Sequence, residues 1–274
     1  MKLVLRVVTG ILLLGLLAVV ALLVPAHLQI QGVEPDLPSE GQLRELLDVA
    51  DGPVRVSYIA TSSQFPMGHT SVMVEWADGR LMMIDAGMDE AAAREFAELV
   101  NMAFDRGEPA IHGTISELLG DDIERVQAVG FTHLHIDHTQ GVLNFCESRG
   151  AGAAAVQTQY QINEQNFNTE EGAEIIAASC LESLQLEGDG LIAVPGFPGV
   201  AVFPLGGHTP GSSLFAVADG ERLLLLSGDI TNSKEDVLSD QDKGFVYSYL
   251  IVPENTDRTT QLRRWLRDLD SQSD

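Results

Sequence analysis

The chain has 274 residues, of which 45% are hydrophobic, and this is enough for one sizeable domain with its own core. Forty acidic residues against 16 basic ones give a formal net charge of −24. Such an acidic surface repels phosphate backbones, so the charge argues against nucleic acid as a partner and favours a solvated acidic coat.

The first 26 residues differ from the rest of the chain. Lys2 and Arg6 precede an apolar run over residues 7–24, and a positive flank before an apolar segment is typical of a signal peptide or a membrane anchor. The run is just long enough to cross a hydrocarbon core, at about 1.5 Å per residue. Val24, Pro25 and Ala26 also fit a small-residue cleavage site, so signal peptide and anchor both stay open.

The positive flank also predicts a location. By the positive-inside rule, the rest of the chain lies on the non-cytoplasmic side of the membrane. We therefore expect an envelope protein, either membrane-anchored or periplasmic or secreted, whose membrane contact is confined to the N-terminal segment.

The domain is expected over residues 54–274, after a tether over residues 27–53 that includes a short helix at 41–50. A strand at 54–59 opens the domain, because apolar residues alternate there. Strands at 71–76 and 80–85 follow, and the Asp78-Gly79 pair between them predicts a hairpin.

The remaining elements alternate between helices and strands. Spacing predicts helices at 89–104, 115–119, 139–145, 170–186 and 256–269, and strands at 126–131, 200–203, 213–217 and 223–226. A weak internal repeat is also present. The chain from His69 to Asp85 and the chain from His208 to Asp229 both read strand, Asp-Gly turn, strand and small-residue loop. This pattern suggests two related β-rich halves covered by helices.

The chain has two cysteines, Cys146 and Cys180. An exported location would permit a disulfide between them, and a pair of ordinary buried thiols is the alternative.

Chemistry is concentrated directly after the strand at 126–131. His133, His135, Asp137 and His138 occupy six positions there. In an extended chain His133 and His135 project to the same side and can bind one ion. A turn into the next helix would aim Asp137 and His138 at a second ion. Imidazole with carboxylate suits zinc, and also iron or manganese.

Two later residues fit the same site. His208 lies in a glycine-flanked loop between strands, where backbone freedom allows a side chain to be aimed. Asp229 follows the strand at 223–226, and its two carboxylate oxygens can bridge two ions.

Residues 54–267 resemble the metallo-β-lactamase superfamily, and within it the glyoxalase II and lactonase type. The family pattern His-x-His-x-Asp-His is matched in full, and its later histidine, bridging aspartate and early strand-end aspartate fall on His208, Asp229 and Asp85. The resemblance implies an α/β fold, the four-layer αβ/βα sandwich, here preceded by the hydrophobic segment. It implies up to two zinc ions, the first held by His133, His135 and His208, the second by Asp137 and His138, with Asp229 bridging.

The chain departs from the family in one respect. The family supplies one more histidine to the second metal after a final helix and strand, and no histidine follows Asp229 here. Either the chain is truncated or its second site is weak, completed by solvent or empty. We expect His69 and His112 to be ordinary loop residues.

The implied function is hydrolysis of an ester, thioester or lactone-type bond in a small-molecule substrate. A metal lowers the pKa of bound water from 15.7 to about 7, and Asp137 would orient the resulting nucleophile or accept its proton. The alternative is a metal-binding envelope protein with little or no catalysis. Antibiotic hydrolysis is disfavoured, because common β-lactamases have a cysteine where this chain has Asp229. His135 argues against a flavodiiron oxidoreductase.

Overall fold

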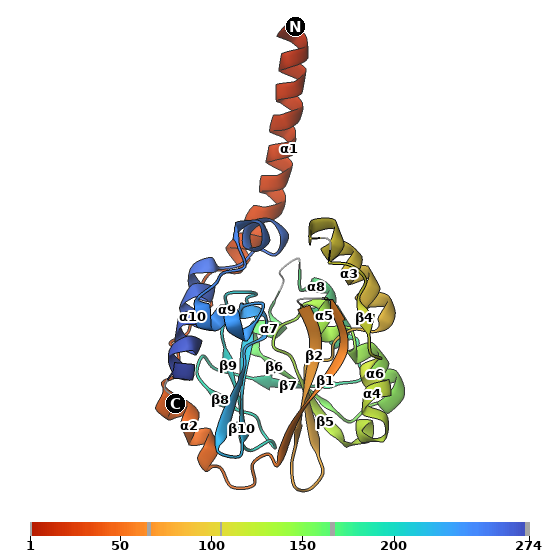
Figure 1. Ribbon diagram of the computed structural model, residues 1–274, viewed down its shortest axis with the longest axis vertical. Helices are drawn as coiled ribbons and strands as arrows, with labels where there is room; N and C mark the ends of the chain where they lie inside the picture. The colour runs from red at the N-terminus through yellow and green to blue at the C-terminus, as the bar shows by residue number, and fades with distance from the viewer. Residues whose placement is uncertain (1, 65–66, 105, 165–167, 272–274) are drawn as a thin grey trace.

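The computed structural model describes residues 2–64, 67–104, 106–164 and 168–271, and in it two β-sheets pack face to face between outer helices (Figure 1). The first sheet has the strand order β4-β1-β2-β3-β5-β6-β7 and the second the order β11-β10-β9-β8. This is the four-layer αβ/βα sandwich that the sequence predicted.

The strands follow one another in chain order. The first sheet contains β1 (Arg55–Gln64), β2 (Met67–Glu75), β3 (Leu81–Ile84), β4 (Ala110–Ile111), β5 (Val126–Gly130), β6 (Ala154–Thr158) and β7 (Glu182–Leu186). The second contains β8 (Ile192–Ala193), β9 (Val200–Pro204), β10 (Ser213–Asp219) and β11 (Arg222–Leu226). Both predicted Asp-Gly hairpins are present, one in each sheet, as β2–β3 and β10–β11.

Helices lie before, between and after these strands. The α-helices are α1 (Lys2–Gln29), α2 (Glu40–Arg44), α3 (Glu90–Phe104), α4 (Ile115–Leu119), α5 (Ile136–Thr139), α6 (Val142–Arg149), α7 (Gln159–Ile162), α8 (Glu170–Ala177), α9 (Lys234–Ser239) and α10 (Thr256–Ser271). Short 3₁₀ turns are η1 (Glu45–Asp48), η2 (Gly120–Arg125) and η3 (Gly228–Ile230), and η4 (Tyr247–Ile251) is a π-helical turn.

Three hydrophobic layers hold the four structural layers together. Side chains between the sheets include Met82, Ile84, Val202 and Phe215. The central strands alternate between layers, so that Met83, next to Met82, packs instead among residues of α4 and α6. A third cluster joins the second sheet to α10 through residues such as Leu262. Strands buried on both faces explain the near-continuous apolar runs in the sequence.

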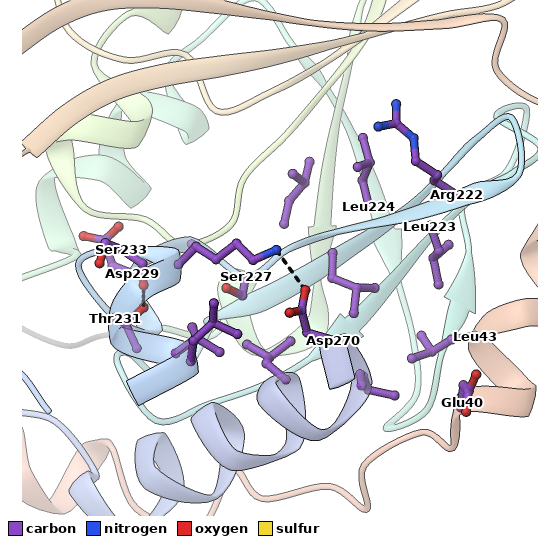
Figure 2. A pocket seen from close by; sticks show the side chains of 18 of the residues that line it. Glu40, Leu43, Arg222, Leu223, Leu224, Ser227, Asp229, Thr231, Ser233 and Asp270 are labelled. Carbon is purple, nitrogen blue, oxygen red and sulfur yellow. Dashed lines mark hydrogen bonds and ion pairs between the residues drawn. The ribbon is translucent and has the colours of Figure 1, made fainter. Parts of the chain in front are cut away.

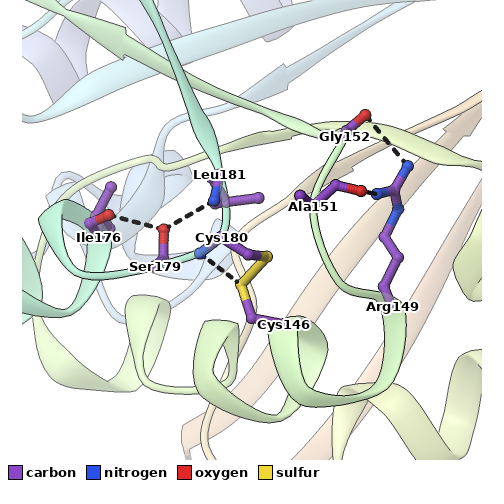
Figure 3. The surroundings of a disulfide bond; sticks show 8 residues. All are labelled: Cys146, Arg149, Ala151, Gly152, Ile176, Ser179, Cys180 and Leu181. Atoms are coloured by element: carbon purple, nitrogen blue, oxygen red, sulfur yellow. Dashed lines mark hydrogen bonds between the residues drawn. A yellow bond between two sulfur atoms is a disulfide. The ribbon is translucent and has the colours of Figure 1, made fainter.

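The predicted helix at 170–186 is only half correct. The helix α8 ends at Ala177, and residues 182–186 form β7, which pairs in parallel with β6. The chain turns between them at Ser179, whose Oγ donates to Ile176 O and accepts from Leu181 N (Figure 3). A serine that bonds the backbone in this way competes with helix continuation.

The helix predicted at 139–145 is also divided. The helix α5 ends at Thr139 and α6 begins at Val142, with Gly141 between them. A side chain on Gly141 would overlap the carbonyl oxygen of Ala86, and the Gly141 amide donates to Gly87 O at 2.8 Å. The break therefore brings the loop after β3 against the start of α6.

Of the two alternatives for the cysteines, the disulfide is present. Cys146 on α6 is bonded to Cys180, which lies just before β7 (Figure 3). The bond ties the helical layer to the edge of the first sheet, and such bonds persist in oxidising compartments.

The N-terminal segment forms one long helix that projects from the domain (Figure 1). Residues 4–29 of α1 are long and apolar enough to cross a membrane, and none of its most apolar window is buried. The helix continues through Pro25, and Ala26 and Ile30 are buried against the domain. Further along, Leu43 and Leu46 of α2 and η1 pack beneath the second sheet. The boundaries predicted from sequence, 1–26, 27–53 and 54–274, remain predictions, although parts of the middle segment are packed against the domain.

Candidate metal centre

The site begins at the C-terminal end of β5, which is buried between β3 and β6. The chain continues through Thr132, whose carbonyl accepts from Ser213 N at 2.7 Å and so joins the two sheets. His133 follows and is fully buried. The side chain that opens the site is thus held at the junction of the sheets.

Three imidazole nitrogens converge there. His133 Nε2 lies 2.9 Å from His135 Nδ1, and His208 Nε2 lies 3.1 Å from the same atom. An ion with ligand bonds of about 2.0–2.1 Å in tetrahedral geometry separates its ligand nitrogens by about 3.3 Å. The three histidines are therefore spaced as ligands of one ion.

Burial keeps two of these histidines neutral. It lowers the pKa of His133 well below its usual value, and it lowers the pKa of His135 to about 3, in each case with help from the neighbouring histidines. Neutral imidazole is the form that binds metal. His133 and His135 would therefore accept a cation at neutral pH without first losing protons.

A second group lies beside the first. His133, His138 and Asp229 also place ligand atoms within 4.8 Å of one another. His138 Nε2 is 3.6 Å from Asp229 Oδ1 and 3.6 Å from Asp137 Oδ2. Burial opposes ionisation of Asp137, but the charge of His138 and a bond from His69 outweigh it and lower its pKa to about 2. All six residues predicted from sequence are thus brought into one site.

Asp85 contacts the ring nitrogen of His138 that does not face Asp137 and Asp229. Its Oδ1 accepts from Thr132 N at 2.8 Å, and its Oδ2 accepts from Thr132 Oγ1 at 2.8 Å and pairs with His138 Nδ1 at 2.9 Å. The backbone of Asp85 has φ = 60°, a conformation that costs energy outside glycine and tends to persist at functional sites. Fixing Nδ1 leaves Nε2 of His138 facing Asp137 and Asp229.

The prediction that His69 is an ordinary loop residue is wrong. His69 lies in β2, and its Nδ1 is 3.4 Å from Asp137 Oδ2. Its ring meets Phe96 edge-on, with the ring centroids 5.2 Å apart. His112, in contrast, follows β4, and among the described residues its imidazole hydrogen-bonds only Ser63 Oγ, at 3.3 Å. The internal repeat in the sequence could have indicated the role of His69. The histidine and the aspartate of both repeat units lie at the site.

Two further residues were not anticipated. Glu254 Oε1 pairs with His208 Nδ1 at 2.5 Å, and Lys243 Nζ donates to the same oxygen at 2.9 Å. Lys243 also donates to the carbonyl of Asp229, and Ser248 Oγ donates to Glu254 Oε2 at 2.6 Å. Burial raises the pKa of Glu254, but the charge of Lys243 and the bond from His208 outweigh it and lower the pKa to about 2. An ionised carboxylate thus fixes the orientation of His208.

Glu164 is buried against Gly211 of the His208 loop. Its ionisation gives a pH-dependent prediction. Burial raises its pKa to about 7, against opposing bonds from Thr209 and Gly211. Between pH 4.5 and 7 the unfolded chain ionises this carboxyl while the folded chain keeps it protonated, so stability falls as pH rises through that window. Glu164→Gln keeps the neutral form. We expect it to leave the free energy of unfolding unchanged at pH 4 and to raise it at pH 8 by on the order of 3 kcal/mol.

Urea unfolding at the two pH values measures this difference. Glu98→Gln, at an exposed position on α3, is the matched control and should show no pH-dependent effect. An equal effect of Glu164→Gln at pH 4 and pH 8 would contradict the prediction.

A cavity of about 830 Å³ runs along β11, and Asp229 is the one candidate ligand among the described residues that line it (Figure 2). Asp229 and Ser227 lie at one end, and Leu223, Leu224 and Arg222 at the other. The Asp229 side chain is 39% exposed, so it is reachable from this cavity. The volume is in the range of small-molecule sites, with a polar end and an apolar wall.

Comparisons with known proteins were consistent with this architecture. The model of the metallo-beta-lactamase superfamily matches residues 65–270, more than half of the chain. A comparison with curated proteins finds no match.

Several solved structures are similar in fold. One is a variant of B. thuringiensis AiiA with N-decanoyl-L-homoserine bound at its active site, at 15% identity, TM-score 0.57, and coverage of 80% of this chain and 91% of that chain. Another is an N-acyl homoserine lactone hydrolase with the product N-hexanoyl-L-homoserine at its catalytic metal centre, at 16% identity, TM-score 0.55, and coverage of 80% and 91%. A probable metal-dependent hydrolase from Staphylococcus aureus matches at 15% identity, TM-score 0.52, and coverage of 78% and 84%. Similarity at these identities shows the fold alone.

Proposed function

The chain belongs to the metallo-β-lactamase superfamily, and from that premise we propose that it is a metal-dependent hydrolase acting on an ester, thioester or lactone-type bond of a small molecule. The observation that carries the proposal is the convergence of three imidazole nitrogens: His133 Nε2 and His208 Nε2 both lie within 3.1 Å of His135 Nδ1. Imidazole nitrogens that converge at this spacing are arranged as metal ligands are.

We assign the ligands as the sequence predicted. His133, His135 and His208 would hold the first ion, and Asp137 and His138 the second, with Asp229 between them. Zinc suits this nitrogen and oxygen set, and iron or manganese would also be accepted. A bound metal supplies a hydroxide nucleophile at neutral pH and polarises a carbonyl.

Two side chains near the metal ligands would orient the reacting groups. Asp137 is ionised at neutral pH, since its pKa is about 2, so it can accept a hydrogen bond and hold the attacking group in line. Burial, with the charges of Asp229 and Glu254, raises the pKa of Tyr247 well above its usual value. Tyr247 therefore stays a neutral phenol that can donate to a substrate oxygen.

The substrate class follows from the cavity. Its wall along β11 is formed by Leu223, Leu224 and Leu226, and its polar end by Asp229 and Thr231. A compound with a carbonyl at one end and an apolar chain at the other fits this distribution. The acyl homoserine compounds bound by the structural neighbours have that form, and we propose a substrate of the same general kind.

Two features support an envelope location. The disulfide between Cys146 and Cys180 is typical of an oxidising compartment, and Lys2 and Arg6 favour a cytoplasmic N-terminus. Because Ala26 is buried and the helix runs through it, we favour a retained anchor over a cleaved signal. The domain would then lie on the non-cytoplasmic side.

Metal content and turnover together test the function. The full chain, purified in detergent, is analysed for zinc, iron and manganese and then assayed with an ester, a thioester and an acyl homoserine lactone. Two metals per chain with turnover of one substrate class is the expected result. Bound metal without turnover of any class would support the non-catalytic alternative, and a folded protein that takes up no metal would overturn both.

A further inference from the structure

A cluster of exposed apolar side chains lies on one short segment, residues 244–251. Phe245 is 67% exposed and Leu250 is 50% exposed. Three neighbours, Val246, Tyr249 and Ile251, are also exposed, by 38–57%. Elsewhere in the described domain, large exposed apolar residues occur mostly singly, as at Val54, Leu143 and Leu238. Scattered apolar residues are ordinary, whereas a cluster marks a contact surface.

The segment lies against the base of α1. His27 Nε2 is 3.1 Å from the carbonyl oxygen of Tyr249, and the two rings are 5.5 Å apart. In Figure 1 a coil in the blue of residues near 250 lies beside the point where α1 leaves the domain. The exposed cluster therefore lies beside the root of the helix that is apolar enough to span a membrane.

No spacer separates that helix from the domain. The apolar run ends at Val24, and Ala26 is already buried. Two residues of helix rise only about 3 Å. If α1 lies in a bilayer, the domain surface at its root is held against the headgroups.

The inner side of the same segment belongs to the metal centre. Ser248 Oγ donates to Glu254, and Lys243, just before the segment, bonds Glu254 as well. Lys243 Nζ also lies 5.0 Å from the centroid of the Tyr247 ring. One short turn thus has an apolar outer side at the root of α1 and a polar inner side at the metal centre.

We propose that residues 244–251 form a second membrane contact, in which Phe245, Val246 and Leu250 enter the interfacial region of the bilayer that holds α1. Aromatic and aliphatic side chains beside a polar backbone suit that region. The partner is an uncharged or zwitterionic lipid surface, because a chain of net charge −24 is repelled by anionic headgroups. The metal centre then lies directly behind the lipid contact.

Quenching by brominated lipid tests the contact on the full chain. Phe245→Trp and, separately, Leu250→Trp are reconstituted in phosphatidylcholine vesicles with and without bromine on the acyl chains. We expect the added tryptophan emission to be largely lost in brominated vesicles. Val54→Trp is the matched control. Val54 is exposed and directly precedes β1, which begins at the end of the sheets away from α1 (Figure 1). Its added emission should be unchanged by bromine.

Two results would overturn the proposal. One is unquenched emission at both positions 245 and 250 in vesicles where the protein is inserted. The other is quenching that equals that of Val54→Trp. If a separate Phe245→Cys variant instead forms disulfide-linked dimers on oxidation, the cluster is an interface between two copies of the chain, and the lipid contact is wrong.

Discussion

Replacing His133 with alanine is expected to abolish binding of the first ion and to remove hydrolysis. His133 is one of the three histidines assigned to that ion, and it is fully buried. Removing a group behind a metal ligand costs roughly 10–100-fold in affinity. Removing a ligand itself should therefore cost more than about 100-fold.

Two measurements check this result independently of turnover. The metal content from elemental analysis should fall from two metals per chain to one or fewer. Thermal unfolding gives the second readout, because an ion that binds only the folded chain raises its stability in proportion to RT ln(1 + [L]/Kd). Added zinc should raise the melting temperature of the wild type by clearly more than that of His133→Ala.

The matched control is His112→Ala, which removes an exposed imidazole that bonds only Ser63 among the described residues. It should retain metal, zinc-dependent stabilisation and activity. Full metal content in His133→Ala would contradict the ligand assignment and with it the proposed function.

The parts of the site encoded locally could be predicted from sequence. His133, His135, Asp137 and His138 lie within six positions after a buried strand, and strand geometry alone aims the first two together. The fold was also accessible, because the central strands are buried on both faces and the Asp-Gly turns mark their hairpins.

The predictions that were wrong, and the residues that were missed, depend on contacts between distant parts of the chain. Residues 182–186 form an edge strand whose mixed pattern matches a helix as well as a strand, and pairing with β6 decides between them. Glu254 and His208 are 46 positions apart, and Lys243 and His208 are 35 apart. No local pattern specifies contacts of that range. His69 was misjudged because only the tertiary fold brings β2 beside α5.

The segment after β11 contributes side chains to the His208 side of the site. No strand follows β11 in the part of the chain that the structure describes. Residues 243–255 instead return to the site and supply Lys243 and Glu254 to the outer side of His208. These contacts orient His208 and also reach the backbone of Asp229.

Glu254→Gln is expected to weaken metal binding and, separately, to destabilise the fold. Gln keeps the size of the side chain but loses its charge, so His208 loses a carboxylate partner at Nδ1. Loss of such a partner lowers metal affinity by roughly 10–100-fold. It also leaves Lys243, whose side chain is 4% exposed, as a buried cation without its carboxylate, which costs about 3–5 kcal/mol.

A second substitution separates the two effects. Lys243→Met in the Glu254→Gln background removes the unpaired cation, and apolar replacement of a buried ion pair is often close to neutral. The double variant should recover most of the lost free energy of unfolding, measured by urea titration of the metal-free protein. It should not recover metal affinity, measured by competition with a chelator, because His208 still lacks its carboxylate. Recovery of both quantities would show that Glu254 serves only to neutralise Lys243, and unchanged metal affinity in the single variant would show that it does not position His208 at all.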